Sequence, residues 1–523
     1  MAKAFLIFLI GFFFRLAWLG QYPVGFYSNE ALLGYRGKLL AQELVDETGR
    51  KLPLIFTSFQ GYQLPFSSYL VALSVKLFGL NEWAVRLPFA IVSCLGLIAI
   101  FSIIRLLFPK EKQLAFWTTV VMAVSPGAIF LSRFPSDWNL VFNLFLLGFW
   151  LFLFLIKKRR LKFLFFILFL SLLFSLSIFF SYLRLPGASK DFTTHQLGFF
   201  TDSTILNGVN QMRGEDLRAG KPLLGRLFYN KSFYVTRLVA TALDHFKPQF
   251  YFASGDGNSL HGLSNFGPIL PVFLPLFLAG VYFLFQKNDL AQKKKLLISW
   301  FLLGIIPSVF SLPSPDQEKL IFVFPVLAIL IGYTASRLKR YQRGWLVVFL
   351  ILNFGFVFYD AFYKEPLRTQ QVWSYGAKQL AEKLQSQSAD FDQILVTDSY
   401  TPDLGPQLLF YFHYPSQKLW RETNLEEGRV FYHQWISQIG KIKIGQLNSW
   451  QIKAGEKGLL VITPQEKWIL AHYRFLAKNG RPSKKTCFQL SDQIVGLDGK
   501  PIYLLAAGIS DHCLLRIESE KEK

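Results

Sequence analysis

Long apolar stretches dominate the first 363 residues, and short basic runs separate them. A helix needs about 17 to 25 residues to cross a bilayer. The stretches that approach or exceed this length are 3–20, 84–108, 113–131, 138–156, 161–183, 267–286, 295–312, 319–336 and 344–362. The pattern therefore predicts a mainly α fold, a polytopic transmembrane bundle of roughly nine helices. The first stretch could also pass for a signal peptide, but it has no evident cleavage site, so we expect a retained helix.

The basic runs predict the orientation of these helices. Lysine and arginine collect in cytoplasmic loops of membrane proteins, and here they lie at 105–112, 157–162, 287–295 and 337–343. This arrangement predicts a cytoplasmic N-terminus in a multi-pass protein of the plasma membrane. Two connections on the outer side, 21–65 and 184–266, are then long, and long loops tend to be functional.

Two further apolar segments are expected to lie in the membrane surface rather than across it. The segment 66–80 is only about 15 residues long, which is short for a span. Residues 226–246 are rich in aromatic side chains and suit an interfacial helix. We accordingly predict that each of the two long outer loops contains an extracytoplasmic helix that lies at the membrane surface.

The composition changes after residue 363. A helix-like stretch at 372–387 is followed by strand-like runs at 393–396, 459–463 and 502–506, which predicts a small α/β domain. The expected domains are thus a membrane domain over 1–363 and a soluble extracytoplasmic domain over 364–523.

Charge and cysteine content exclude several functions. The formal net charge is +22, but the basic runs follow the topology of the membrane, so nucleic-acid binding is not expected. Three cysteines cannot build a disulfide framework or a thiolate metal site, and no metal site is predicted. Cys94 is expected to serve packing, whereas Cys487 and Cys513 could pair if their domain lies outside the cytoplasm.

Three charged residues could carry chemistry at the outer side. Glu30 follows the first helix, Asp137 opens another helix after Ser132-Arg133, and Arg86 begins the second span. Each has a simpler interpretation: Glu30 as a solvated loop acid, Asp137 as a helix cap or the partner of Arg133, and Arg86 as a side chain that snorkels to the interface. Their shared side of the membrane is what favours a site.

The segment Gly255-Asp256-Gly257-Asn258 is typical of a turn. His245 is expected to cap or anchor the interfacial helix. Neither feature indicates a function on its own.

Taken in order, these segments resemble the GT-C class of membrane glycosyltransferases, closest to the branch of protein O-mannosyltransferases and aminoarabinose transferases (glycosyltransferase family 39). The segments that carry the resemblance are Pro23 to Glu30, Gly61-Tyr62-Gln63-Leu64-Pro65, Leu77 to Pro88, Ser125-Pro126, Ser132-Arg133 to Asp137, His245-Phe246, Gly255-Asp256, His261-Gly262, Gly267, and Lys319 with Pro325. The resemblance covers most of residues 1–365.

The resemblance implies that a sugar is transferred from a polyprenyl-phosphate donor to an acceptor hydroxyl of a protein, lipid or glycan, with no other cofactor. A lipid phosphate is a good leaving group, so one base for the acceptor proton and cations for the phosphate suffice. The family normally has Asp-Glu in the first outer loop, where this chain has Asn29-Glu30. An amide accepts no proton, so either Glu30 or Asp137 is the base, or the protein binds without turnover.

We therefore expect Glu30 and Asp137, with Asn29 beside them, to flank the acceptor hydroxyl. The residues expected to hold or steer the donor are Arg86, Arg133, Arg184, Lys319, Tyr62, Asp256 and His261. Lys319 stands where the family usually has arginine, and Gln63 where close relatives have lysine, so some cationic contacts are weaker here. A silent relative that binds lipid-linked sugar or a partner, and less readily a transporter, are the alternatives.

Overall fold

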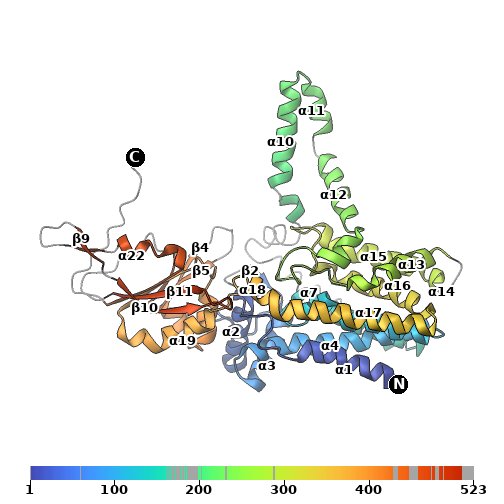
Figure 1. Cartoon of the computed structure of the whole chain (residues 1–523), viewed down its shortest axis with the longest axis horizontal. Helices are drawn as coiled ribbons and strands as arrows, with labels where there is room; N and C mark the ends of the chain where they lie inside the picture. The colour runs from blue at the N-terminus through green and yellow to red at the C-terminus, as the bar shows by residue number, and fades with distance from the viewer. Residues whose placement is uncertain are drawn as a thin grey trace. The chain divides into compact units, whose positions relative to one another are not determined.

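The computed structural model describes residues 2–508 except 59–60, all but a few positions of 161–197, and short gaps at 202, 230–231, 287–288, 428–433, 447–456, 473, 477–481 and 487. The predicted span 161–183 and the predicted pair Cys487 and Cys513 therefore lie largely or wholly outside the described residues. The chain forms two compact units, Met1–Ala17 with Leu87–Phe362, and Trp18–Arg86 with Tyr363–Lys523. Figure 1 shows a mainly helical chain with one mixed sheet, which confirms the predicted fold class.

Apolar helices make up the first unit. They are α1 (Ala2–Leu16), α4 (Glu82–Leu107, which starts in the second unit), α5 (Lys112–Val124), α6 (Pro126–Leu131), α7 (Asp137–Lys157), α13 (Leu274–Leu284), α15 (Lys294–Val309), α16 (Phe324–Arg337) and α17 (Arg340–Tyr359). Among the described residues, four runs are long and apolar enough to cross a membrane: Glu82–Leu107, Asp137–Lys157, Lys319–Arg337 and Arg340–Thr369. The chain is thus a membrane protein, and four of the predicted spans are helices of sufficient length.

The remaining predicted spans are shorter or interrupted. α1 and α13 are apolar helices of 15 and 11 residues, and the stretch 113–131 is divided at Ser125 into α5 and α6. Pro126 follows that break, where a proline can begin a helix but not continue one. The number of spans and the sidedness of the termini stay predictions.

Helix α16 is the centre of the first unit. Nearly all of its residues are buried, and it packs on α5 and α13. Two glycines permit this contact: a Cβ at Gly332 would lie 2.6 Å from Thr118 Oγ1, and one at Gly280 would lie 2.4 Å from the Leu330 carbonyl oxygen. Small residues that let backbones approach are typical of helix packing in membranes.

Shorter elements connect these helices. Between α7 and α13 lie η1 (Gly198–Thr201), α10 (Ser203–Arg218), α11 (Pro222–Phe228), α12 (Ser232–Asp244) and the π-helix η2 (Phe250–Ser254). The 3-10 helices η3 (Pro271–Phe273) and η4 (Lys319–Val323) lead into α13 and α16, and α14 (Asp289–Gln292) precedes α15. The loops 255–270 and 310–318 remain irregular and carry most of the charged groups described below.

The second unit is built on a seven-stranded sheet. Its order is β10-β11-β7-β3-β6-β5-β4, with β3 parallel to both neighbours β6 and β7 and the other pairs antiparallel. The strands are β3 (Gln393–Thr397), β4 (Thr423–Glu427), β5 (Gln434–Ile439), β6 (Ile442–Gly445), β7 (Gly458–Ile462), β10 (Phe488–Val495) and β11 (Pro501–Gly508). β8 (Arg474–Leu476) and β9 (Pro482–Thr486) form a separate hairpin. The three predicted strands and the helix α19 (Ala377–Gln387) are confirmed.

Both faces of this sheet are covered. Ile394 and Val396 point to one face, whose core includes residues of α19, α20 (Gly405–Tyr411) and α21 (Ser416–Glu422). Leu395 points to the other face, against α22 (Ile469–His472). This alternation is what a strand buried on two sides requires.

The connection 21–65, predicted to be an outer loop, belongs to the same unit. It forms α2 (Ser28–Glu43) and a hairpin of β1 (Phe56–Ser58) and β2 (Gly61–Gln63), and leads into α3 (Pro65–Phe78). Leu32, Tyr35 and Leu39 of α2 enter the core of the sheet. The prediction of domains at 1–363 and 364–523 remains a prediction, because compactness groups residues 18–86 with the C-terminal sheet.

Helix α3 has the length predicted for a surface helix. It has 14 residues and packs on α2 through one face. Its other face exposes Leu73, Leu77 and Phe78. A helix this short with one exposed apolar face suits the membrane interface better than a span.

Candidate functional site

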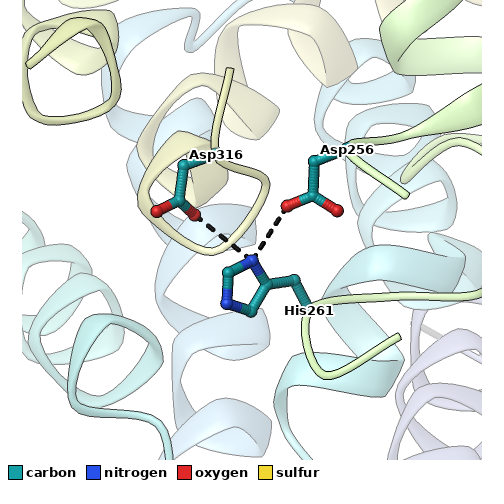
Figure 2. A group of neighbouring side chains, drawn as sticks. All are labelled: Asp256, His261 and Asp316. Carbon is teal, nitrogen blue, oxygen red and sulfur yellow. Dashed lines mark hydrogen bonds and ion pairs between the residues drawn. The ribbon is translucent and has the colours of Figure 1, made fainter. Parts of the chain in front are cut away.

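A cluster of charged side chains lies in the first unit, where the loops 255–270 and 310–318 meet the start of α7. Its centre is His261, as Figure 2 shows. The Nδ1 atom of His261 lies 2.8 Å from Asp256 Oδ2 and 3.5 Å from Asp316 Oδ1, and its Nε2 atom lies 3.6 Å from Glu318 Oε2. We refer to Asp256, His261, Asp316, Glu318 and Lys319 as the charged cluster.

Turn chemistry places the first two members. Asp256 Oδ1 accepts a hydrogen bond from the backbone N–H of Asn258 at 2.9 Å, the geometry of an Asx turn. Its Oδ2 accepts from the backbone N–H of Gln317 at 2.9 Å, and the Gln317 side chain donates to the His261 carbonyl oxygen at 2.8 Å. These bonds fasten the two loops to each other, so the cluster is held by backbone as well as by charge.

Hydrogen bonds in the turn before η4 place the other members. Asp316 Oδ1 accepts from the backbone N–H groups of Glu318 and Lys319, at 3.0 and 3.3 Å, as an N-cap does at the start of a helix. The Lys319 ammonium lies 3.5 Å from Asp316 Oδ2 and 5.8 Å from the centre of the Trp138 ring. Lys319 is thus a buried cation between a carboxylate and an aromatic face.

The cluster keeps His261 protonated. Burial alone would lower the pKa of His261, but the hydrogen bond to Asp256 and the charges of Glu318, Asp316 and Asp256 raise the pKa to about 9. Burial raises the pKa of Glu318, although His261 and Ser136 oppose this effect. His261 is therefore an imidazolium at neutral pH, and the cluster holds two cations among its carboxyl groups.

The start of α7 contacts this cluster. The hydroxyl of Ser136, the N-cap of α7, donates to Glu318 Oε1 at 2.6 Å and accepts from the backbone N–H of Asn139. Asp137 follows it with an exposed side chain, and its charge acts on Glu318. The sequence allows Ser136 or Asp137 as the cap of this helix; Ser136 is the N-cap observed, and the Asp137 side chain is exposed.

Part of the cluster has the spacing of a cation site. Donor atoms of Asp256, His261 and Asp316 all lie within 4.8 Å of one another. A divalent cation there would have to displace the proton of His261, because a metal ligand must be a neutral imidazole. The raised pKa of His261 therefore opposes metal binding near neutral pH.

In the second unit, Glu30 and Arg86 form a buried ion pair. The Arg86 guanidinium donates to Glu30 through Nε at 3.0 Å and through Nη2 at 2.8 Å, and both side chains are almost fully buried. Glu30 also closes the N-terminus of α2 by accepting from the Tyr27 N–H at 3.2 Å. The remaining Arg86 protons go to the carbonyl oxygens of Leu19, Pro23 and Gly25.

This pair corrects two interpretations drawn from the sequence. Glu30 is not a solvated loop acid, and Arg86 does not snorkel to the surface, because each neutralises the other in the interior. The pair was not predicted, since the two residues are 56 positions apart. With both carboxylate oxygens and the guanidinium engaged by protein, neither group is poised for a substrate in this structure.

Position 29 differs from its neighbours. Asn29 is exposed in the first turn of α2. Next to it, the buried Ser28 hydroxyl donates to Asp403 Oδ2 at 2.8 Å.

Tyr62, predicted to contact the donor, lies in β2 with a partly buried side chain.

The other predicted cations are placed differently from one another. Arg133 is almost fully buried, and its terminal nitrogens donate to the carbonyl oxygens of Phe14 and Ala17 at 2.6 Å each. It therefore ties the end of α1 to the end of α6. Arg184 is exposed in a turn.

Asp316 and Glu318 were not predicted from the sequence. A signal existed: Asp316, Glu318 and Lys319 form a charged run directly before an apolar span. The anchoring role predicted for His245 agrees with the structure, in which its Nε2 lies 2.8 Å from Ser308 Oγ.

Comparisons with known proteins bear on this arrangement. Residues 63–185 match the family model of dolichyl-phosphate-mannose-protein mannosyltransferases, which confirms the resemblance over that segment. The segment contains Arg86, Arg133 and Asp137. No curated protein matches the chain in sequence.

Solved structures give weaker likenesses. ArnT from Cupriavidus metallidurans in the apo state has a TM-score of 0.47 and 14% identity over 97% of this chain and 98% of its own. The same protein bound to undecaprenyl phosphate has a TM-score of 0.43 and 12% identity over 97% of each chain. The oligosaccharyltransferase of Archaeoglobus fulgidus in complex with zinc and sulfate has a TM-score of 0.37 and 14% identity over 79% of this chain and 61% of its own. All three scores lie below 0.5, so the family match and the charged cluster carry the functional conclusion.

Proposed function

We propose that the chain transfers a sugar from a polyprenyl-phosphate donor to an acceptor hydroxyl at the extracytoplasmic side of the membrane. The observation that carries this proposal is the meeting of Asp137, which lies in the segment that matches the mannosyltransferase model, with the charged cluster through Ser136 and Glu318. An exposed carboxylate thus adjoins a cluster that holds one buried cation, Lys319, and one partly buried cation, His261. These are the elements that such a transfer needs: a base, and positive charge near the leaving phosphate.

Asp137 is the group assigned to the acceptor. Glu30 has both carboxylate oxygens bonded to Arg86, whereas the Asp137 side chain is exposed at the start of α7. As the sugar C1–O bond to the phosphate breaks, the acceptor oxygen forms the new bond to C1 and its proton passes to the Asp137 carboxylate. The lipid phosphate leaves with the electron pair of the broken bond and needs no proton at neutral pH, so a second carboxyl acid is unnecessary.

Lys319 and His261 are assigned to the donor phosphate. Both are cationic and lie within one cluster, where Asp316 contacts each of them. The Asp316 carboxylate holds both side chains in place in the absence of substrate, and the negative charge that develops on the leaving phosphate would draw on the same N–H donors. Arg86 and Arg133 are given structural roles, because protein atoms accept their terminal protons.

A second function has one specific observation in its favour. Asn29 stands exposed where the resemblance implies an aspartate base. If that position is indispensable, the chain binds the lipid-linked sugar without transferring it. Binding without turnover would then be the expected result of the assay below.

The test uses purified full-length protein in lipid nanodiscs with a panel of polyprenyl-phosphate sugars. Release of polyprenyl phosphate from one member of the panel, with gain of the sugar by an added acceptor, supports transfer. Saturable binding of a donor without release supports the silent alternative. Absence of both binding and release for every donor would refute the proposal.

A further inference from the structure

The helices α10, α11 and α12 form an arm within the first unit. Figure 1 shows α10 leading away from α15 and α16, and α11 and α12 returning, across the direction in which α16 and α17 run. Helices α10 and α11 are tied together away from the turn that joins them: the side chain of Arg213, within α10, donates to the carbonyl oxygen of Tyr229, at the end of α11. Because α16 and α17 belong to runs long enough to cross a bilayer, an arm that crosses their direction extends along the membrane plane.

The arm exposes an apolar stripe. On α12 and just beyond it, Val235, Val239, Leu243 and Phe246 are exposed to 60%, 52%, 61% and 52%. Their spacing of three to four residues places them on one side of the helix. Arg237 and Asp244 occupy the opposite side, so α12 is amphipathic, and Val235, Val239 and Leu243 on its apolar side are exposed in the described structure.

Helix α11 also exposes large apolar side chains. Leu223, Leu227 and Phe228 are exposed to 78%, 64% and 61%. The described residues of the arm and its foot are also more basic than acidic. The basic residues are Arg213, Arg218, Lys221, Arg226, Arg237 and Lys247, and the acidic ones are Glu215, Asp216 and Asp244.

Both feet of the arm are fixed to the end of α15. At one foot, the Phe199 N–H donates to the Phe310 carbonyl oxygen, and the Phe200 ring stacks on that of Phe310. At the other foot, His245 is fully buried, its Nε2 lies 2.8 Å from Ser308 Oγ, and Phe246 packs on Phe301. The arm is therefore held at both of its ends by contacts with α15.

The attachment reaches the charged cluster. Ser308 Oγ, which meets His245, also accepts from the backbone N–H of Asp316 at 2.7 Å. One side chain thus joins the foot of the arm to a cluster member. Two hydrogen bonds therefore link the foot of the arm to Asp316 through Ser308.

We propose that α10–α12 is a membrane-surface arm whose apolar stripe inserts into the interfacial region of one leaflet, with its basic side chains against anionic lipid headgroups. Continuity supports a lipid occupant: α15, to which the feet are fixed, itself exposes Leu302, Leu303 and Ile306. Charge supports it too, since basic amphipathic helices with large exposed apolar residues bind anionic interfaces. This inference does not depend on sugar transfer.

The test measures membrane depth at two neighbouring positions of α12. Val239→Cys and Arg237→Cys are made separately in a full-length background with Cys94, Cys487 and Cys513 replaced by alanine, and labelled with the same small fluorophore. Each is placed in nanodiscs that contain phosphatidylglycerol and a lipid carrying a nitroxide near the headgroup. The expected result is lipid quenching about threefold stronger at position 239 than at 237, with the reverse order for iodide in the water.

Two outcomes would overturn the proposal. Equal quenching at the two positions by lipid nitroxide and by iodide would place the arm in water. Shielding of position 239 from both quenchers would mean that a second copy or another part of the protein covers the stripe. Nanodiscs of phosphatidylcholine alone test the contribution of anionic lipid. Weaker lipid quenching at position 239 is expected in them, and unchanged quenching would show that the basic side chains do not need anionic headgroups to hold the arm at the membrane.

Discussion

Replacing Glu30 by glutamine is the change whose consequence the structure defines most fully. Glu30→Gln keeps the size of the side chain and an oxygen that can accept from the Tyr27 N–H. It removes the charge that neutralises Arg86, whose guanidinium is fully buried. The three carbonyl oxygens that share Arg86 supply dipoles but no compensating charge.

The magnitude follows from the burial of the pair. Breaking a buried ion pair by removing one partner costs about 3–5 kcal/mol, because the other charge stays uncompensated. The second unit is of a size for which 1 kcal/mol corresponds to about 2–4 °C in the unfolding midpoint. Glu30→Gln should therefore lower the midpoint by roughly 10 °C.

A double-mutant cycle separates pairing from catalysis. The thermal midpoint of purified protein is measured for the wild type, Glu30→Gln, Arg86→Met and the double variant. The double variant should lose less stability than the sum of the single losses, with a coupling of about 2–3 kcal/mol. Lys378→Met is the control. It removes the ion pair between Lys378 and Glu82, in which the lysine is exposed, and should change the midpoint little.

One combination of results would refute this reasoning. If Glu30→Gln unfolds at the wild-type temperature but has lost sugar transfer, Glu30 acts on the substrate and the buried pair is not its role. Additive losses in the cycle would show equally that the two residues do not depend on each other.

The remaining predictions concern the helix terminus at position 29 and the charged cluster. Asn29→Asp adds a carboxylate to the first turn of α2 and should stabilise the fold by about 0.3–1 kcal/mol; a thermal shift checks this, and a simultaneous rise in turnover would identify position 29 as a degenerate base. Because the pKa of His261 is raised from 6.5 to about 9, its pairing stabilises the fold fully below pH 6.5 and is lost as the pH rises through about 9. The thermal midpoint of the wild type should therefore fall over that window, and His261→Gln should flatten this fall. Asp256→Asn removes the nearest partner of His261, so the window should move to lower pH; an unchanged window would contradict the assigned origin of the shift.

The sequence predicts those parts of this molecule that depend on local pattern. Apolar length predicts the four long spanning helices, and alternation predicts β3, β7 and β11. Hydropathy does not predict the break at Ser125, because a short helix that begins with a proline inside an apolar run leaves the average hydropathy of the run unchanged.

The site residues divide in the same way. Asp137 and His261 were identified by their order along the chain, but the partners that set their chemistry, Glu318 and Asp316, come from a loop 55 or more residues beyond His261. The pairing of Glu30 with Arg86 likewise arises only when α2 folds against the start of α4. Which charges neutralise each other is a tertiary property, and no local pattern encodes it.

Single-turnover release of polyprenyl phosphate, measured for wild type and Asp137→Asn in the same nanodiscs, shows whether Asp137 is the general base. If it is, the variant binds the donor with unchanged affinity while release slows by about 10²–10⁴-fold, the range for loss of a general base. Release at the wild-type rate by Asp137→Asn would show that Asp137 does not take the acceptor proton.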